Sequence, residues 1–191
     1  MVGNNAVQYC YLLQLESINM SIIKRIITSF AHRKKFRNLV NRVISQGVLC
    51  SKKIRIIVDG TFNCGKNCTF SSEGIDSCGA TIQILFGGHL EVGNNSGFSQ
   101  SSIICTQSIK IGNNVKIGAG CLIMDSNFHS LDYLKRRNRS TDSLNAKREA
   151  VTIDDDVFIG ARSLVGKGVH IGARTIIAAG SVVVNDHPSD C

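Results

Sequence analysis

Large aliphatic residues recur at every sixth position between residues 153 and 184, in the stretch IDDDVFIGARSLVGKGVHIGARTIIAAGSVVV. An α-helix repeats near every 3.6 residues and a half-buried strand every second residue, so neither element explains this period. A period of six describes a short strand followed by a corner, and three such units close one triangular turn of a parallel β-helix. The residues predicted to stack into its core are Ile153, Ile159, Val165, Ile171, Ile177 and Val183.

The positions beside this aliphatic column fit the same architecture. The residue after most column positions is Gly or another small or turn-forming residue, which suits a corner. Four positions after the column we expect inward-facing residues that are small or β-branched, because the interior before a corner is crowded. These residues are Val157, Ser163, Val169, Thr175 and Ser181. The low aromatic content, 6%, also fits a narrow prism with little room for large rings.

The repeat extends upstream with one irregularity. The predicted upstream column is Val92, Phe98, Ile104, Ile111, Ile117 and Ile123, with a slip of one residue near 109–110. A bulged corner absorbs such an insertion. Between residues 54 and 92 the sequence is strand-like and punctuated by Gly, but the phase is ragged, so we expect earlier and less regular coils there.

Two segments lack the repeat. Residues 125–152 are polar and charged, and an irregular insertion of this length is usually functional or disordered, so we expect a protruding loop that carries chemistry. Residues 21–44 have apolar residues at helical spacing and predict an amphipathic helix. The predicted organisation is an N-terminal extension (1–19), a basic helical cap (20–50) and a β-helix domain (51–191) with a loop at 125–152.

Positive charge is concentrated in the N-terminal part of the chain. Between Ser17 and Val58 there are ten Lys or Arg and no acid, whereas the formal net charge of the chain is +8. We expect a cap that covers the open end of the β-helix and leaves its charges in solvent. The alternative is a weak peripheral membrane contact, in which residues 21–44 bind anionic lipid. Nucleic acid is not an expected partner, because no binding module surrounds the helix.

The sequence also predicts a cytoplasmic protein with reduced cysteines. No apolar run approaches the roughly 20 residues that span a bilayer, and residues 1–19 make a poor signal peptide. Cys64, Cys68 and Cys78 lack the paired spacing of a zinc site, so no metal is expected. Cys121 stands four residues after Ile117, and we expect it to be a small interior residue.

Three stretches together resemble a known family. IKIGNNVKIGAGCLIMDSNFHSLD, VTIDDDVFIGARSLVGKGVHIGA and IIAAGSVVVNDHP are similar to the left-handed β-helix, hexapeptide-repeat acyltransferases, particularly the surface-polysaccharide and galactoside O-acetyltransferase branch. The resemblance covers residues 82–188. It implies a left-handed coil, a homotrimer, and transfer of an acetyl group from acetyl-CoA, held in the groove between neighbouring prisms, to a sugar hydroxyl in polysaccharide biosynthesis.

The resemblance also implies catalytic residues. His129 matches the family's catalytic histidine, and histidine is suited to remove a hydroxyl proton because its charge changes near neutral pH. A carboxylate on its other ring nitrogen would fix the tautomer, and Asp125 is the first candidate, with Asp132 as a second. Asn127 stands where this branch often has an acid, and it is a candidate donor to the acceptor or to a developing oxyanion.

Residues for acetyl-CoA follow from motif position. Ala161 and Ala179 are expected to line the pantetheine groove, and Phe158 stands where relatives commonly place Trp. Gly160, Gly168 and Gly180 are expected to allow close backbone approach. Asn185 replaces a frequent Lys and Val184 a frequent Thr, and the sequence stops at HPSDC, where relatives continue into a basic strand. The expected consequence is weaker phosphate contact, unless the loop cations Arg136, Arg137 and Arg139 compensate.

The same residues are compatible with other functions. A β-helix with a decayed site would be a binding or structural protein, and an amino-sugar nucleotide would make the reaction an N-acetylation. A zinc carbonic anhydrase on the same scaffold needs three converging histidine ligands. The spacing of His89, His170 and His187 relative to His129 does not suit that arrangement.

Overall fold

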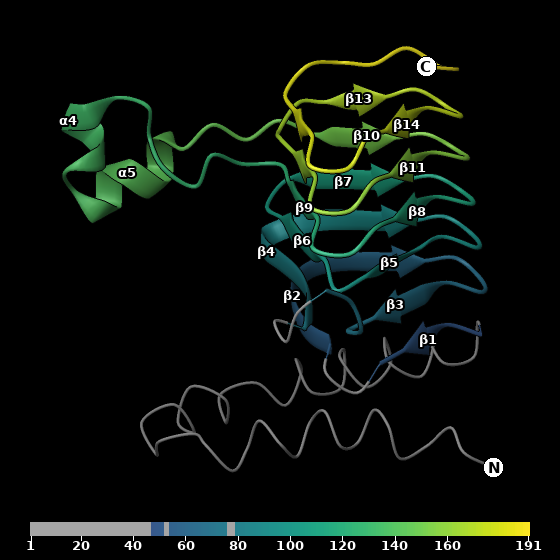
Figure 1. Cartoon of the computed structure of the whole chain (residues 1–191). Helices are drawn as coiled ribbons and strands as arrows, with labels where there is room; N and C mark the ends of the chain where they lie inside the picture. The colour runs from purple at the N-terminus through teal and green to yellow at the C-terminus, as the bar shows by residue number, and fades with distance from the viewer. Residues whose placement is uncertain (1–46, 52–53, 76–78) are drawn as a thin grey trace, which may run out of the picture.

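The computed structural model describes residues 47–51, 54–75 and 79–191, which coil upward as a triangular prism (Figure 1). All strand pairs in this part of the chain are parallel, as the six-residue period predicted. The predicted extension at 1–19 and the basic helix at 21–44 lie outside the described residues. The strands are β1 (Leu49–Cys50), β2 (Ile54–Cys64), β3 (Thr69–Ser71), β4 (Ala80–Val92), β5 (Gly97–Ser99), β6 (Ser102–Cys105), β7 (Ser108–Ile111), β8 (Lys116–Ile117), β9 (Leu122–Met124), β10 (Val151–Ile153), β11 (Phe158–Ile159), β12 (Leu164–Val165), β13 (His170–Ile171), β14 (Ile176–Ile177) and β15 (Val182–Val183).

The prism has three faces. The first face is the sheet β1-β3-β5-β8-β11-β14. The other two faces form one continuous sheet, because β2 and β4 each bend from one face into the next. The second face holds β7, β10 and β13, and the third face holds β6, β9, β12 and β15. At the bend of β4, Phe86 and Gly87 both have positive φ, 57° and 78°.

Three corners join these faces, and we name them by what they carry. The Asn/Asp corner leads from the second face to the first, through 93–95, 112–114 and 154–156. The Gly/Ala corner leads from the first face to the third, through 118–120, 160–162 and 178–180. The arm corner leads from the third face to the second, and there the chain leaves the prism after β9 and returns at β10 (Figure 1).

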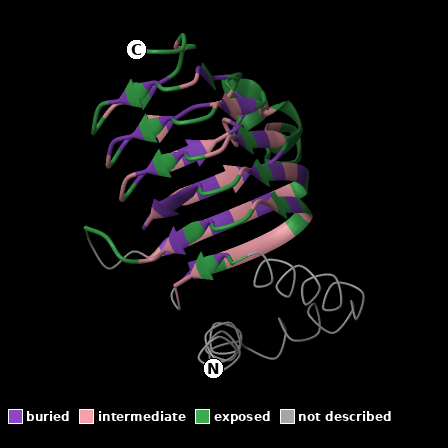
Figure 2. Ribbon diagram, turned by 90° about the vertical axis from the view of Figure 1, so that its right-hand side faces the viewer, coloured by how far each residue is buried: buried purple, intermediate pink, exposed green. Residues whose placement is uncertain are grey.

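The core is the predicted aliphatic column, with one correction. Buried positions alternate with exposed ones along the coils (Figure 2), and Ile153, Ile159 and Ile171 are at most 1% exposed. The prediction for Ile104 is wrong: Ile103 and Cys105 are buried, and Ile103 pairs in register with Ile123. The irregularity therefore begins at the corner before β6, where the step from Phe98 to Ile103 is one residue short, and continues at the arm corner between β6 and β7, where the step from Ile103 to Ile111 is longer than six residues.

Small residues fill interior positions, as predicted, and these positions directly follow the corners. Cys121 and Ser163 are 2% exposed and Thr175 is fully buried. The Ser163 hydroxyl donates to the carbonyl of Gly160 at 2.8 Å, so the polar atom is satisfied inside the prism. Cys64, Cys68, Cys105, Cys121 and Cys191 are free thiols. Within the described part of the chain, no helix has the length and apolar character that a bilayer crossing requires.

Candidate functional site

An arm projects from the arm corner between β9 and β10 (Figure 1). Its two ends form a short antiparallel ribbon, which we call the stalk (residues 125–127 and 147–149). The Asn127 amide donates to the carbonyl of Lys147 at 3.0 Å, the Glu149 amide donates to the carbonyl of Asp125 at 3.0 Å, and Ser126 pairs with Arg148 between them. The arm is therefore tied to the prism through backbone hydrogen bonds at its base.

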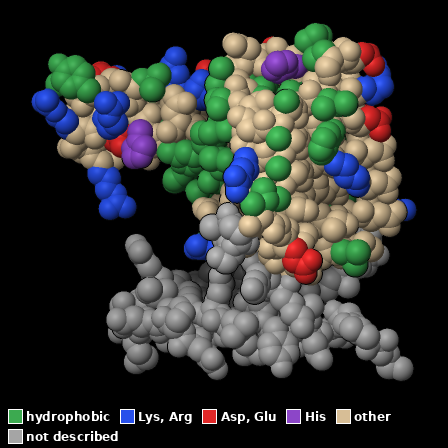
Figure 3. All heavy atoms as spheres, in the orientation of Figure 1, with side chains coloured by type: hydrophobic (Ala, Val, Ile, Leu, Met, Phe, Trp, Pro, Cys, Tyr) green, Lys and Arg blue, Asp and Glu red, His purple; other side chains and the backbone are tan. Residues whose placement is uncertain are grey.

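Two short helices form the tip of the arm: α4 (Tyr133–Arg136) and α5 (Arg139–Asn145). Each begins at a side chain that caps its first turn, since Asp132 accepts from the Leu134 amide at 2.9 Å and Asn138 from the Ser140 amide at 3.0 Å. Neither helix has a buried residue. Figure 3 shows Lys and Arg side chains gathered on this arm. Because its two helices have no buried residue, polar contacts rather than an apolar core hold the arm together.

His129 lies on the arm and pairs with an acid that the sequence analysis did not identify. Its Nδ1 lies 2.7 Å from Oδ2 of Asp142, and the Ser130 amide donates to the other carboxylate oxygen at 2.7 Å. These bonds, first the one from His129, hold the pKa of Asp142 below its usual value. The side chain of Asp142 is 13% exposed and that of His129 is 69% exposed. The ring is therefore oriented on one side and open on the other.

The prediction that Asp125 orients His129 is wrong. Asp125 is fully buried, and its carboxylate accepts hydrogen bonds from the amides of Thr106, Gln107 and Ser108 and from the Thr106 hydroxyl, at 2.7 to 2.9 Å. This carboxylate closes the arm corner of the coil below. Asp132 is occupied as the cap of α4. No motif or helical spacing pointed to Asp142, because the pair forms only when the loop folds back over thirteen residues.

Asn127 lies half-buried in the stalk, next to Phe128, whose φ of 59° turns the chain toward His129. Its backbone amide is used by the stalk, whereas its side-chain amide has no hydrogen-bond partner among the described residues. The structure therefore brings Asn127 and His129 to the same end of the arm, and leaves the Asn127 side chain free for an acceptor.

Four of the predicted acetyl-CoA residues gather at the Gly/Ala corner. Ala161, Ala179 and Gly180 are partly or fully exposed there, while Gly160 is buried. A Cβ on Gly160 would lie 2.4 Å from the backbone nitrogen of Ala179. Glycine at that position serves the stacking of coils, which corrects the expectation that it admits a ligand. Phe158, on the adjacent first face, is 47% exposed.

The remaining predicted residues lie at a different corner. Gly168 has φ of 77° and lies beside the stalk residue Glu149, and Asn185 is exposed after β15. Both belong to the arm corner, with His129. A single chain therefore places His129 and the Gly/Ala corner at separate edges of the prism.

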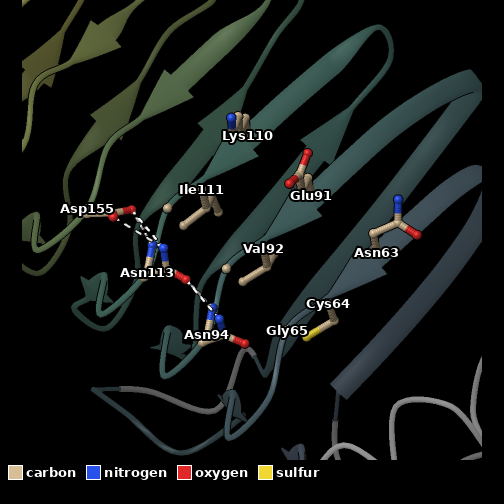
Figure 4. A pocket seen from close by; sticks show the side chains of 12 residues that line it. Asn63, Cys64, Gly65, Glu91, Val92, Asn94, Lys110, Ile111, Asn113 and Asp155 are labelled. Carbon is tan, nitrogen blue, oxygen red and sulfur yellow. Dashed lines mark hydrogen bonds between the residues drawn. The ribbon is translucent and has the colours of Figure 1, made fainter.

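A groove of about 540 Å³ lies at the Asn/Asp corner (Figure 4). Its polar groups bond one another between coils, since the Asn94 amide donates to Oδ1 of Asn113 at 2.8 Å and the Asn113 amide to Oδ1 of Asp155 at 2.7 Å. Such a ladder stabilises the stacked corners. The groove contains neither His129 nor the predicted acetyl-CoA residues, so we do not assign it to catalysis. Among the described residues, no cluster of His, Cys, Asp and Glu is arranged to hold a metal ion.

Comparison with known families gives two matches within the β-helix. Residues 150–185 match the bacterial transferase hexapeptide (six repeats), and residues 91–124 match the hexapeptide repeat of succinyl-transferase. Both segments lie in the regular coils described above.

Two curated relatives extend this comparison. Galactoside O-acetyltransferase of Escherichia coli is 29% identical over 109 residues, which cover 56% of this chain and 50% of that protein. A 2,3,4,5-tetrahydropyridine-2,6-dicarboxylate N-acetyltransferase of Clostridium perfringens is 54% identical over 37 residues, 19% of this chain and 16% of that protein. The matched regions thus span between a sixth and half of these relatives.

Solved structures share the architecture. A hexapeptide-repeat acetyltransferase from Vibrio cholerae superposes with a TM-score of 0.50 at 23% identity, covering 98% of this chain and 82% of its own. A mutant of AntD, an N-acyltransferase from Bacillus cereus in complex with dTDP and coenzyme A, superposes with a TM-score of 0.56 at 19% identity, covering 84% and 81%. The left-handed β-helix is the fold of such neighbours, so the predicted fold class is confirmed.

Proposed function

We propose that this chain, a member of the hexapeptide-repeat transferase family, transfers an acetyl group from acetyl-CoA to a hydroxyl group of a sugar. The observation that carries the proposal is the pair between His129 and Asp142 on the projecting arm, 2.7 Å apart. A carboxylate that accepts a hydrogen bond from Nδ1–H leaves Nε2 with its lone pair, and Nε2 is then the atom that faces an acceptor.

The pair accounts for each proton in the reaction. Nε2 of His129 removes the hydroxyl proton as the acceptor oxygen bonds to the carbonyl carbon of the thioester. The bond from that carbon to sulfur then breaks, and the imidazolium returns the proton to the departing thiolate. Asp142 stabilises the imidazolium between these two events, and the Ser130 amide keeps the carboxylate in place. The products are a sugar ester and free CoA thiol.

The Gly/Ala corner suits the acyl donor. Ala161, Ala179 and Gly180 give a shallow apolar edge, and the space beside Gly180 is open to solvent. Arg162, on the same corner, is exposed and its guanidinium has no hydrogen-bond partner among the described residues. We assign the pantetheine arm to this edge and the phosphates to Arg162, in addition to the arm cations that the sequence suggested. Coenzyme A accompanies AntD, which has the same fold.

A cysteine nucleophile is not part of this mechanism. Cys105 lies nearest to the arm corner, and burial and the Asp125 carboxylate raise its pKa to about 12. Such a thiol is protonated at neutral pH and is a poor nucleophile. The acetyl group is therefore expected to pass directly to the acceptor within a ternary complex.

The proposal includes a homotrimer, because His129 and the Gly/Ala corner lie on separate edges of one prism. Two copies would bring the arm of one beside the Gly/Ala corner of the next. The faces that meet at this corner expose large apolar side chains, with Ile176 65% exposed on the first face and Val182 68% exposed on the third. Contact between copies would bury this surface.

The test is an acetyl-transfer assay with acetyl-CoA and a panel of oligosaccharides, neutral sugars and amino-sugar nucleotides. We expect O-acetyl products, which mild base cleaves, whereas N-acetyl products survive it. Base-stable products formed only from amino sugars would replace the proposed reaction by N-acetylation. If no acceptor and no hydrolysis of acetyl-CoA is detected with a folded protein, the chain is a binding or structural β-helix.

A further inference from the structure

Phe86 stands in an unusual place for an aromatic residue. It lies at the bend of β4 on the arm corner, where its side chain is 61% exposed and its φ is 57°. A bulky residue is disfavoured in the left-handed region, and an exposed ring contributes little to a core. The bend is made by two residues with positive φ, Phe86 and Gly87, and the space beside Gly87 is open. The turn of the backbone therefore does not depend on packing of the Phe86 ring.

The Phe86 ring is in contact with a cation from the catalytic arm. The guanidinium carbon of Arg148 lies 4.9 Å from the ring centroid, within the range of a cation–π interaction. Arg148 pairs with Ser126 in the stalk, and His129 follows Ser126 by three residues. The contact therefore joins the bend of β4 to the same stalk that presents the catalytic histidine.

The charge of Arg148 is not neutralised by any described residue. Its guanidinium makes no hydrogen bond or ion pair in the described part of the chain, and its Nε is enclosed without a partner. The nearest carboxylates in the stalk are already used, because Glu149 bonds to Lys167 at 2.7 Å and Asp125 is filled by backbone amides. Lys147 adds a further exposed positive charge.

A free guanidinium beside an exposed ring is suited to one kind of ligand. The planar donors of arginine match the oxygens of a carboxylate or a phosphate in a two-bond geometry. The exposed part of the ring can bury the apolar face of a sugar. Together these groups recognise a saccharide that bears a negative charge.

We propose that Phe86 and Arg148 form an acceptor subsite that binds an anionic group, a carboxylate or a phosphate, on a part of the sugar remote from the reacting hydroxyl. This inference rests on the proposed acetyl transfer, which places the acceptor at the arm. It narrows the acceptor from any sugar to an acidic saccharide or a sugar phosphate.

Binding is measured by calorimetry on the full chain with three probes: UDP, trigalacturonate and neutral maltotriose. We expect one of the two charged probes to bind and maltotriose to bind only weakly. Binding of UDP identifies the anion as a phosphate, and binding of trigalacturonate identifies it as a carboxylate. Arg148→Gln should weaken the charged probe by about tenfold or more, as expected for loss of hydrogen bonds to a charged group. Lys147→Gln, which removes the same charge from the neighbouring position, is the matched control and should retain binding.

Phe86→Asn provides a second variant that keeps the fold, because Asn tolerates the left-handed conformation. It should weaken the same probe while the thermal midpoint stays at or above that of the wild type. In the transfer assay, both variants should raise KM for the charged acceptor by about tenfold with kcat nearly unchanged, since the subsite is remote from the reacting atoms.

The outcomes separate this inference from the proposed function. Equal binding of the charged probe by wild type, Arg148→Gln and Phe86→Asn would overturn the subsite, even if acetyl transfer is observed. Equal losses of affinity for the charged probe in Lys147→Gln and Arg148→Gln would also overturn the subsite. Binding would then depend on the net positive charge of the stalk and not on the Arg148 guanidinium. Arg148-dependent binding without any acetyl transfer would leave the subsite in place and remove the proposed reaction.

Discussion

The prism and the arm are built by different forces. In the prism, column residues such as Ile123 and Val165 are fully buried, and each coil is bonded to the next through parallel backbone pairs. In the arm, neither α4 nor α5 has a buried residue, and Leu144 is 84% exposed. The prism thus follows from apolar burial, whereas the arm depends on specific polar contacts.

Several of these polar contacts lie close to His129 in the sequence of the arm. Arg136 donates to the carbonyl of Ser130 at 2.6 Å, and Lys135 donates to the side chain of Asn145 at 3.1 Å. The first bond ties α4 to the residue after His129, and the second ties α4 to the end of α5. The rigid repeat thus positions an arm whose own geometry is set by a few hydrogen bonds, so the two regions should respond to substitution in different ways.

The largest effect is expected from His129→Ala, which should reduce acetyl transfer by about 10²- to 10⁴-fold, the range for loss of a general base. The thermal midpoint should not change, because the side chain is largely exposed. The matched control is His170→Ala, which removes another exposed histidine paired with a carboxylate, Asp154, at 2.9 Å. Near-normal turnover in His129→Ala would remove this residue from the catalytic role.

Ile159→Ala should have the largest effect on stability. Ile159 is fully buried between Ile117 and Ile177 of the neighbouring coils, so truncation leaves a cavity and costs about 3 kcal/mol of unfolding free energy. For a chain of this size the thermal midpoint should fall by roughly 10 °C. Leu144→Ala on the arm should change it by less than about 1 °C. Similar losses in both variants would show that the arm has an apolar core after all.

Asp142→Asn should reduce kcat by about 10- to 10²-fold, because an amide can donate to Nδ1 and favour the wrong tautomer. Asp125→Asn should affect stability instead of catalysis, because the Asp125 carboxylate accepts hydrogen bonds from buried amides. The thermal midpoint should fall by several degrees, whereas the folded protein should keep its kcat. Steady-state kinetics and thermal melts on both variants check this. A loss of kcat confined to Asp125→Asn would restore Asp125 as the orienting acid.

The smallest effect is expected at the contact between Glu149 and Lys167, which links the stalk to the next coil at 2.7 Å. The bond with Lys167 lowers the pKa of Glu149. Because the folded pKa is depressed, the stabilisation is present above the unfolded value of about 4.3 and is lost as the pH falls through the lower folded pKa. Hydrogen exchange of the stalk amides should therefore differ between wild type and Glu149→Gln at pH 6 and converge in acid. A difference that persists below pH 3 would contradict this origin.

Burial could be predicted from the sequence at some positions and not at others. The period identified Ile159 and Cys121 as interior residues correctly, because burial in a solenoid repeats with the sequence. It misplaced Ile104 because the corner before β6 is one residue tighter than the others, and Gln100 there adopts φ of 42°. The family resemblance suggested Asp125 as the partner of His129, whereas the Asp125 carboxylate bonds to backbone amides of the coil below.

The repeat and the motif alone predicted the β-helix, its core column apart from Ile104, the protruding loop and the candidate histidine. These features depend on local periodicity and on a motif, which are visible residue by residue. Three features become visible only in the folded chain: Asp142 pairs with His129, Gly160 allows the coils to stack, and Arg148 lies over the Phe86 ring without a counter-ion among the described residues. Each of these joins residues far apart in the chain, and their meeting depends on how the arm folds back and how the coils stack.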